Sequence, residues 1–144
     1  MRVAEILKAK DPVILSVRPT ETIQQLAQRL RMERVGAMIV SSDGVKIQGI
    51  ISERDVAHGL AEHGSSILEL KVEQLMTRSV ITCKPDDSIS DIAKVMTERR
   101  IRHLPVEEAG RLVGIVSVGD VVKHRMDELQ LEANVLRDYA VAAH

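Results

Sequence analysis

Aromatic residues are almost absent from this sequence. Phe and Trp do not occur and Tyr139 is the only tyrosine, although 44% of the 144 residues are hydrophobic. The interior must therefore be almost wholly aliphatic, and a stacking platform for single-stranded nucleic acid is not expected. At this length, the hydrophobic content is enough for one compact domain or for two small subdomains that share a core.

An excess of charge of either sign is also missing. Twenty Lys and Arg residues face 21 Asp and Glu residues, so the formal net charge is -1. No large basic field is available for non-specific binding to nucleic acid, which we therefore do not expect as a partner.

Long apolar runs and paired cysteines are absent as well. The start, "MRVAEILKAKDPV", has too short an apolar run for a signal peptide, and no segment approaches the roughly 20 apolar residues that span a membrane. A single cysteine, Cys83, cannot form an intrachain disulfide and is expected to be a small buried residue rather than a reactive thiol. We expect a cytoplasmic protein without a membrane partner.

An internal repeat is the most informative feature that is present. The segments "RPTETIQQLAQRLRMERVGAMIV" and "KPDDSISDIAKVMTERRIRHLPV" align without a gap, and the lead-ins "VAEIL" and "VEQLM" match in type. After a one-residue difference in a turn, "GIISERDVA" aligns with "GIVSVGDVV". We therefore predict one repeat over residues 3–62, a linker over 63–71, a second repeat over 72–125 and a helical extension over 126–144.

The periodicities within each repeat follow one order. "VILSV" and "VITC" are typical of short β-segments, and a helical stripe of apolar residues follows each of them. Two strands and a second helix complete each unit, which gives β-α-β-β-α and an α+β fold. One unit has too few strands to bury its apolar surface, so we expect the two units to pack against each other about a pseudo-twofold axis.

The extension continues an apolar stripe beyond the second repeat. One helical face carries Val122, Met126, Leu129, Ala133, Leu136 and Ala140. Such a stripe most often packs on its own domain, which is the expectation here. Its length also leaves a contact with a partner chain open.

The tandem units, the "RHLPV" strand and the repeated Gly-apolar-apolar-Ser-x-x-Asp ending resemble a pair of cystathionine-β-synthase (CBS) domains, a Bateman module. The resemblance covers essentially the whole chain, from Val3 to about Arg125. It implies a homodimer, and it implies adenosine-containing ligands (AMP, ADP, ATP, NAD(H) or S-adenosylmethionine) in clefts between the repeats. An effector protein that reads out the bound state must then be supposed, unless binding simply buffers and reports energy charge or redox state.

The Ser-x-x-Asp motifs fit that implication chemically. An ionised Asp55 or Asp120 accepts hydrogen bonds only, and can take two O–H donors from a ribose. Ser52 or Ser117 can add one more bond, and the helix N-terminus favours a phosphate. The same residues also read as a capping box, which stabilises each helix by roughly 1 kcal/mol without any ligand. Both interpretations stay open at this point.

Cations that could hold a phosphate are distributed unequally. The second copy places Arg102 and His103 at the start of a strand, where the first copy has Gly36 and Ala37. The first copy instead carries Arg54 inside its Ser-x-x-Asp motif. We expect Arg54, Arg102 and His103 to contact phosphate in two clefts that are not equivalent. The alternatives are solvated surface for Arg102 and a hydrogen bond within the sheet for His103.

Adenine would have to lie in an aliphatic slot, because aromatic side chains are lacking. Most of the candidates also suit the core; they are Val17, Ala37, Ile39, Ile51, Ile81, Cys83, Pro105 and Val116.

Catalytic motifs do not emerge from the sequence. It contains no G-x-S-x-G elbow and no P-loop, and the histidines lack zinc-ligand spacing. We therefore predict a non-enzymatic sensor of AMP, ADP, ATP or NAD(H) without a metal or catalytic cofactor. The alternatives are an S-adenosylmethionine-binding pair, a structural dimerisation module, a nucleotide hydrolase and a nucleic-acid binder.

Overall fold

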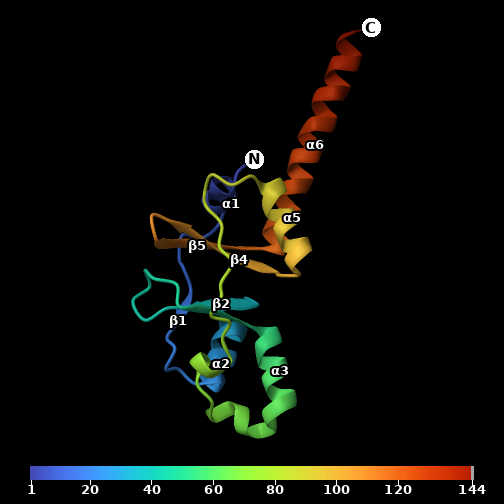
Figure 1. Cartoon of the computed structure of the whole chain (residues 1–144). Coiled ribbons are helices and arrows are strands. Elements are labelled where there is room, and N and C mark those ends of the chain that lie inside the picture. The colour runs from blue at the N-terminus through green and yellow to red at the C-terminus, as the bar shows by residue number, and fades with distance from the viewer. Residues whose placement is uncertain (144) are drawn as a thin grey trace.

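The computed structural model describes residues 1–143, so His144 of the predicted extension lies outside it. The chain forms two small halves, one above the other in Figure 1, and a long C-terminal helix projects from the upper half. The predicted α+β class is confirmed. In chain order the elements are α1 (Val3–Ala9), β1 (Ser16–Val17), α2 (Ile23–Glu33), β2 (Ala37–Val40), β3 (Gly49–Ser52), α3 (Glu53–His63), η1 (Gly64–Glu69), α4 (Val72–Leu75), α5 (Ile89–Arg99), β4 (His103–Glu108), β5 (Arg111–Ser117) and α6 (Val118–Ala142).

Each half contains one small sheet. In the first half β1 pairs in parallel with β2, and β2 pairs antiparallel with β3 so that Ala37 lies opposite Ser52. In the second half β4 and β5 pair antiparallel, with His103 opposite Ser117. The last residue of each hairpin is the Ser of a Ser-x-x-Asp motif, so both motifs leave a sheet at corresponding places.

The first strand of each repeat is shorter than predicted. Only Ser16 and Val17 of "VILSV" form a strand, and only Cys83 of "VITC" makes an isolated parallel bridge, to Val106. The residues before them lead from one half to the other, which leaves them without a neighbouring strand along most of their length.

The short helices at the start of each repeat are exchanged between the halves. Val3 and Ile6 of α1 are buried in the core of the second half, among residues of α5, β4 and β5. Val72 of α4 is buried in the core of the first half. Each half is therefore built from both sequence repeats.

The glycine of the repeated motif makes room for these exchanged helices. A Cβ on Gly114 would lie 2.7 Å from Cδ2 of Leu7 in α1. A Cβ on Gly49 would lie 2.8 Å from Sδ of Met76 and 2.8 Å from the carbonyl oxygen of Thr77. Leu7 and Met76 end the matching lead-ins "VAEIL" and "VEQLM", so the two contacts correspond.

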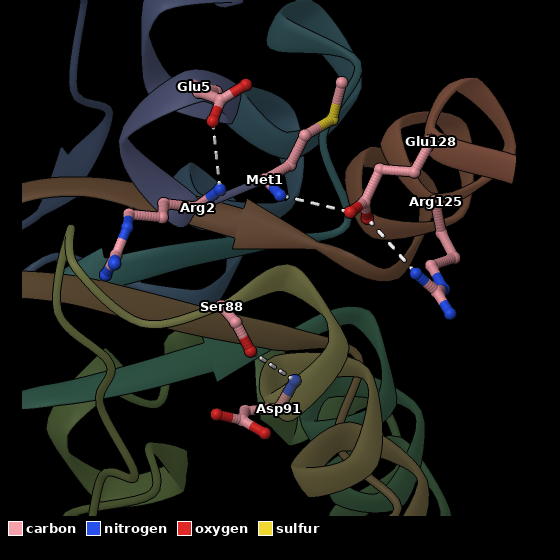
Figure 2. A network of polar contacts seen from close by, with 7 residues as sticks. All are labelled: Met1, Arg2, Glu5, Ser88, Asp91, Arg125 and Glu128. Atoms are coloured by element: carbon pink, nitrogen blue, oxygen red, sulfur yellow. Dashed lines mark hydrogen bonds and ion pairs between the residues drawn. The ribbon is translucent and has the colours of Figure 1, made fainter. Parts of the chain in front are cut away.

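Polar contacts hold the first residues of the chain against the second half (Figure 2). The Met1 amino group donates to Glu128 of α6 at 3.1 Å, and Arg125 donates to the same carboxylate at 3.5 Å. Ser88 caps the neighbouring helix α5 by accepting from the backbone N–H of Asp91 at 3.0 Å. Of these bonds, the one from Met1 to Glu128 joins the start of the chain directly to α6.

Cys83 is buried, as predicted. Burial, with a smaller contribution from the charge of Asp87, raises the pKa of its thiol to about 12. The thiol is therefore protonated and unreactive near neutral pH.

The prediction that the apolar stripe of α6 packs on its own domain is wrong. Val121 is the residue of α6 that is buried, whereas Leu129 is 50% exposed and Leu136 is 69% exposed. The reason is length: α6 has 25 residues and its neighbour α5 only 11, so the distal part of α6 extends past the body of the protein (Figure 1). No helix within residues 1–143 is both long and apolar enough to cross a membrane.

Candidate functional site

A cavity of about 960 Å³ lies between the two halves, and both repeats line it. Its size is at the upper end of the range for small-molecule sites. The predicted site residues that it brings together are Ala37, Ser52, Arg54, Asp55, Ile81, Arg102, His103 and Ser117. Residues that are far apart in the sequence therefore share one site.

Both Ser-x-x-Asp motifs form capping boxes. The backbone N–H of Ser52 donates to Oδ2 of Asp55 at 2.8 Å, and the backbone N–H of Asp55 donates to Oγ of Ser52 at 3.4 Å. The corresponding distances for Ser117 and Asp120 are 2.9 Å and 3.1 Å. Within residues 1–143, Oδ1 of Asp55 has no hydrogen-bond partner, so capping leaves one oxygen of this carboxylate available.

Asp120 differs from Asp55 because a lysine pairs with it. Nζ of Lys10 donates to Oδ2 of Asp120 at 2.7 Å and to the carbonyl oxygen of Ile115 at 2.9 Å. Burial alone would raise the pKa of Asp120, but the bonds from Lys10 and Ser117 outweigh it and hold this pKa below its usual value. Lys10 lines the cavity and Asp120 does not.

His103 reaches from the second repeat to the first. A Cβ on Gly36 would lie 3.4 Å from Cε1 and 3.5 Å from Nε2 of the His103 ring, which is van der Waals contact, so the ring lies directly beside the first repeat. Burial first, and then the charges of Arg102 and Lys10, lower the pKa of His103 below 6.5. The ring is therefore neutral at pH 7, and within residues 1–143 it has no hydrogen-bond partner.

Positive charge is concentrated around the cavity although the whole chain is nearly neutral. The cationic lining residues are Lys10, Arg31, Arg34, Arg54, Arg100 and Arg102. The lining carboxylates are Glu53 and Asp55. None of these arginines forms an ion pair with another residue of the part of the chain that the structure describes. This distribution favours an anionic ligand.

Arg34 and Arg100 occupy corresponding strained positions. Each follows the last residue of a helix, α2 or α5, in the left-handed conformation, with φ of 56° and 55°. Glycine or asparagine is more usual at such a helix end. Two arginines here place two guanidinium groups at the cavity from the two repeats.

Apart from Ala37 and Ile81, the predicted adenine contacts are buried away from the cavity lining. These residues are Val17, Ile39, Ile51, Cys83, Pro105 and Val116. In β3 and β5 the cavity side is formed by Ile50 and Ile115, each one residue before a predicted contact. Strand alternation explains the difference, because the next residue faces the core.

Sequence reasoning missed Lys10, Arg31 and Ser79 as lining residues. Arg31 lies at the same end of α2 as Arg34. Because Arg34 aligns with Arg100 in the other repeat, the sequence could have indicated this helix end as a source of lining cations. Lys10 and Ser79 follow the exchanged helices, and nothing in a single sequence showed this exchange. No group of three or more His, Cys, Asp or Glu residues suited to a metal ion is found in the described part of the chain.

Comparison with known proteins gives one consistent result. The family model described as "CBS domain" matches residues 3–62 and again 72–127. The chain is 31% identical to CBS domain-containing protein YhcV of Bacillus subtilis, over 78% of this chain and 79% of the relative. It is 30% identical to the mitochondrial CBS domain-containing protein CBSX3 of Arabidopsis thaliana, over 95% of this chain and 70% of the relative.

Solved structures agree with these matches. The CBS-domain protein ATU1752 of Agrobacterium tumefaciens is 38% identical, with a TM-score of 0.83 and coverage of 87% of this chain and 99% of that one. The CBS domain pair of protein MJ0100, solved in complex with 5′-methylthioadenosine and S-adenosyl-L-methionine, is 26% identical, with a TM-score of 0.76 and coverage of 85% and 98%.

Proposed function

The chain belongs to the CBS-domain family, whose paired domains are in general regulatory and non-catalytic, and we propose that it senses a phosphate-bearing adenosine ligand: AMP, ADP, ATP or NAD(H). The ligand lies in the cavity between the halves. Its ribose binds a Ser-x-x-Asp motif, and its phosphate binds Arg54, Arg102 and His103, of which the two arginines are charged at pH 7. The observation that carries this proposal is the excess of arginine and lysine over carboxylates in the cavity lining.

Closure of the two halves on the ligand would transmit the bound state. Cations from both repeats line the cavity, so one phosphate bridging them would favour a closed arrangement by its greater affinity for that state. We also propose a homodimer and an effector protein that responds to the closed form.

S-adenosylmethionine is a second candidate ligand, because the structurally similar MJ0100 pair was solved with it. Its sulfonium carries a positive charge, which the cationic lining disfavours. 5′-Methylthioadenosine has neither the sulfonium charge nor a phosphate, so its affinity would depend on the ribose and adenine contacts alone.

A thermal-shift panel of AMP, ADP, ATP, NAD, NADH, S-adenosylmethionine and 5′-methylthioadenosine tests the proposal. We expect the melting temperature to rise with at least one phosphate-bearing ligand and to rise less with the two sulfur compounds, because a ligand that binds only the folded state stabilises it by mass action. Asp55→Ala should weaken binding roughly tenfold or more through loss of a charged acceptor.

The matched control is Asp127→Ala, which removes an exposed carboxylate from α6. It should leave every shift as in the native protein. A panel without any shift would favour a purely structural dimerisation module, and a larger shift with S-adenosylmethionine than with every nucleotide would reverse the choice of ligand.

A further inference from the structure

The two ends of the cavity are closed in different ways. Helix α1 has seven residues and α4 only four, and the additional turn brings Lys10 to the end of α1. At the second-half end, the Lys10 ammonium donates to the carbonyl oxygen of Ile115 at 2.9 Å. At the first-half end, the corresponding carbonyl, that of Ile50, accepts from the backbone N–H of Thr77 at 2.9 Å.

This difference changes the charge that each Ser-x-x-Asp motif presents. The Asp120 carboxylate is paired with Lys10 and does not line the cavity. The Asp55 carboxylate lines the cavity and forms no ion pair with any of residues 1–143. Only the Asp55 end therefore offers an uncompensated acceptor to the two hydroxyl groups of a ribose.

We propose that Lys10 leaves a single ribose-binding site in the cavity. Each chain binds one adenosine nucleotide with its ribose at Asp55, while the ion pair with Lys10 keeps the Asp120 carboxylate from binding a second one. This inference rests on the proposed function. It reduces the candidate ribose-binding motifs from two to one, the motif that contains Asp55. His103 and Arg102 then face the phosphate of the same ligand, since the His103 ring already lies against Gly36 of the first repeat.

Isothermal titration calorimetry with AMP tests this assignment through the number of sites. The wild-type protein should bind about one AMP per chain, and Lys10→Ser should bind about two, because Asp120 is then free to accept a second ribose. The double variant Lys10→Ser with Asp55→Asn should return to about one. Lys8→Ser, which removes an exposed lysine of the same helix, is the matched control and should stay at one.

Each outcome has a distinct meaning. Two AMP molecules per wild-type chain would overturn the role of Lys10 and leave the proposed function standing. A folded Lys10→Ser protein that still binds one AMP would also overturn it, and circular dichroism spectra and melting curves show whether the variant is folded. A wild-type protein that binds no AMP would overturn this assignment together with AMP as a ligand, and the thermal-shift panel separates that case.

A separate observation concerns the exposed stripe of α6. Val122, Leu129 and Leu136 are spaced by seven residues, and Met126, Ala133 and Ala140 form a second such series. The two series alternate at intervals of four and three residues, which is the spacing of the a and d positions of a coiled coil. Leu131, also exposed, lies on a different face of the helix.

Charges beside the stripe match a particular arrangement of two helices. In this heptad register Glu132 takes position g and Arg137 takes position e of the next heptad, and neither is in an ion pair within the described residues. In a parallel pair, position g of one helix faces the following e position of the other. Two copies of this chain would therefore form two Glu132 to Arg137 contacts, whereas antiparallel helices would not.

We infer that α6 pairs with α6 of a second copy as a parallel, in-register two-stranded coiled coil along this stripe. The occupant is a second copy because the stripe is self-complementary both in its apolar spacing and in its charges. This inference does not depend on any ligand.

Cross-linking of a full-length cysteine variant tests the register. Leu136→Cys should form an intermolecular disulfide rapidly under mild oxidation, because a parallel in-register pair places the two positions side by side. Leu131→Cys, on another face of the same helix, should cross-link slowly. The native Cys83 is buried and should not contribute.

Charge exchange provides an independent readout. Glu132→Arg and Arg137→Glu should each raise the dimer dissociation constant measured by analytical ultracentrifugation, and the double exchange should restore it. Equal cross-linking at positions 136 and 131, or single exchanges that leave association unchanged, would overturn the parallel pairing.

Discussion

Ser52 and Asp55 show how one pair of residues can serve a helix and a ligand together. Oδ2 of Asp55 accepts the backbone N–H of Ser52 at 2.8 Å, while Asp55 itself lines the cavity. The sequence alone left capping and ligand binding as alternatives. The structure makes them compatible, because the cap uses one carboxylate oxygen and leaves the other available.

His103 predicts a pH dependence of stability. Its pKa in the folded protein lies below 6.5, chiefly because of burial, so the unfolded chain binds a proton more readily than the folded one. The free energy of unfolding should therefore fall as the pH drops from above 6.5 through the folded pKa. Urea unfolding at pH 7.5 and pH 5.5 measures this, and His103→Gln should lose less stability over the same interval than the native protein.

A bound phosphate should raise the pKa of His103, which burial lowers in the free protein. It favours the protonated ring, so the ratio of the native affinity for AMP to that of His103→Gln should rise as the pH falls from 7.5 to 6. His58→Gln, which changes an exposed histidine, is the control and should follow the native protein. A ratio that does not change with pH would remove His103 from the phosphate site.

At the level of single residues, the sequence was informative where the repeat supplied two copies. Ser52, Asp55, Arg102 and His103 were selected from the duplicated motif and the charges near it, and the structure brings all four to one cavity. Apolar contacts were harder to predict, because the faces of a strand alternate and a shift of one residue exchanges Ile50 for Ile51.

At the level of elements, the repeated glycines predict unequal costs of substitution. Gly49→Ala should lower the free energy of unfolding by about 1–3 kcal/mol, because the new Cβ meets the carbonyl oxygen of Thr77, which cannot move independently of the backbone. Gly114→Ala should cost less, because its Cβ meets only the end of the Leu7 side chain.

A second substitution, in the side chain that each new Cβ meets, distinguishes the cost at Gly114 from the cost at Gly49. Leu7→Ala should remove most of the cost of Gly114→Ala, whereas Met76→Ala should leave most of the cost of Gly49→Ala in place. Gly119→Ala, whose Cβ would lie in ordinary contact at 3.6 Å from Oγ of Ser117, is the control and should not be destabilising. Equal costs at Gly49 and Gly114 would contradict this account of the exchanged helices.

The order of the longer helices and of the hairpin strands could be predicted, but the short helices α1 and α4 and their exchange could not. Both helices have matching apolar residues, and either core would accept either helix by local pattern alone. The choice depends on the path of the connecting residues between the halves. The same limit explains why Lys10, which follows an exchanged helix, was missing from the predicted site. The distal part of α6 is exposed because no other element of the chain extends as far.

At the level of the whole molecule, the exchanged helices and the shared cavity make one unit of two repeats. Each half contains elements of both repeats, so a ligand between the halves acts on the entire folded chain. Lys10 and the unequal cations break the pseudo-twofold symmetry at the cavity. The exposed face of α6 then offers a route by which a second copy could be held in a fixed register.

The structure of the protein with AMP bound tests the central claim most directly. We predict one AMP in the cavity between the halves, with its ribose hydroxyl groups donating to Asp55 and its phosphate beside Arg102 and His103. AMP bound outside this cavity, or bound within it with the ribose away from Asp55, would contradict the account.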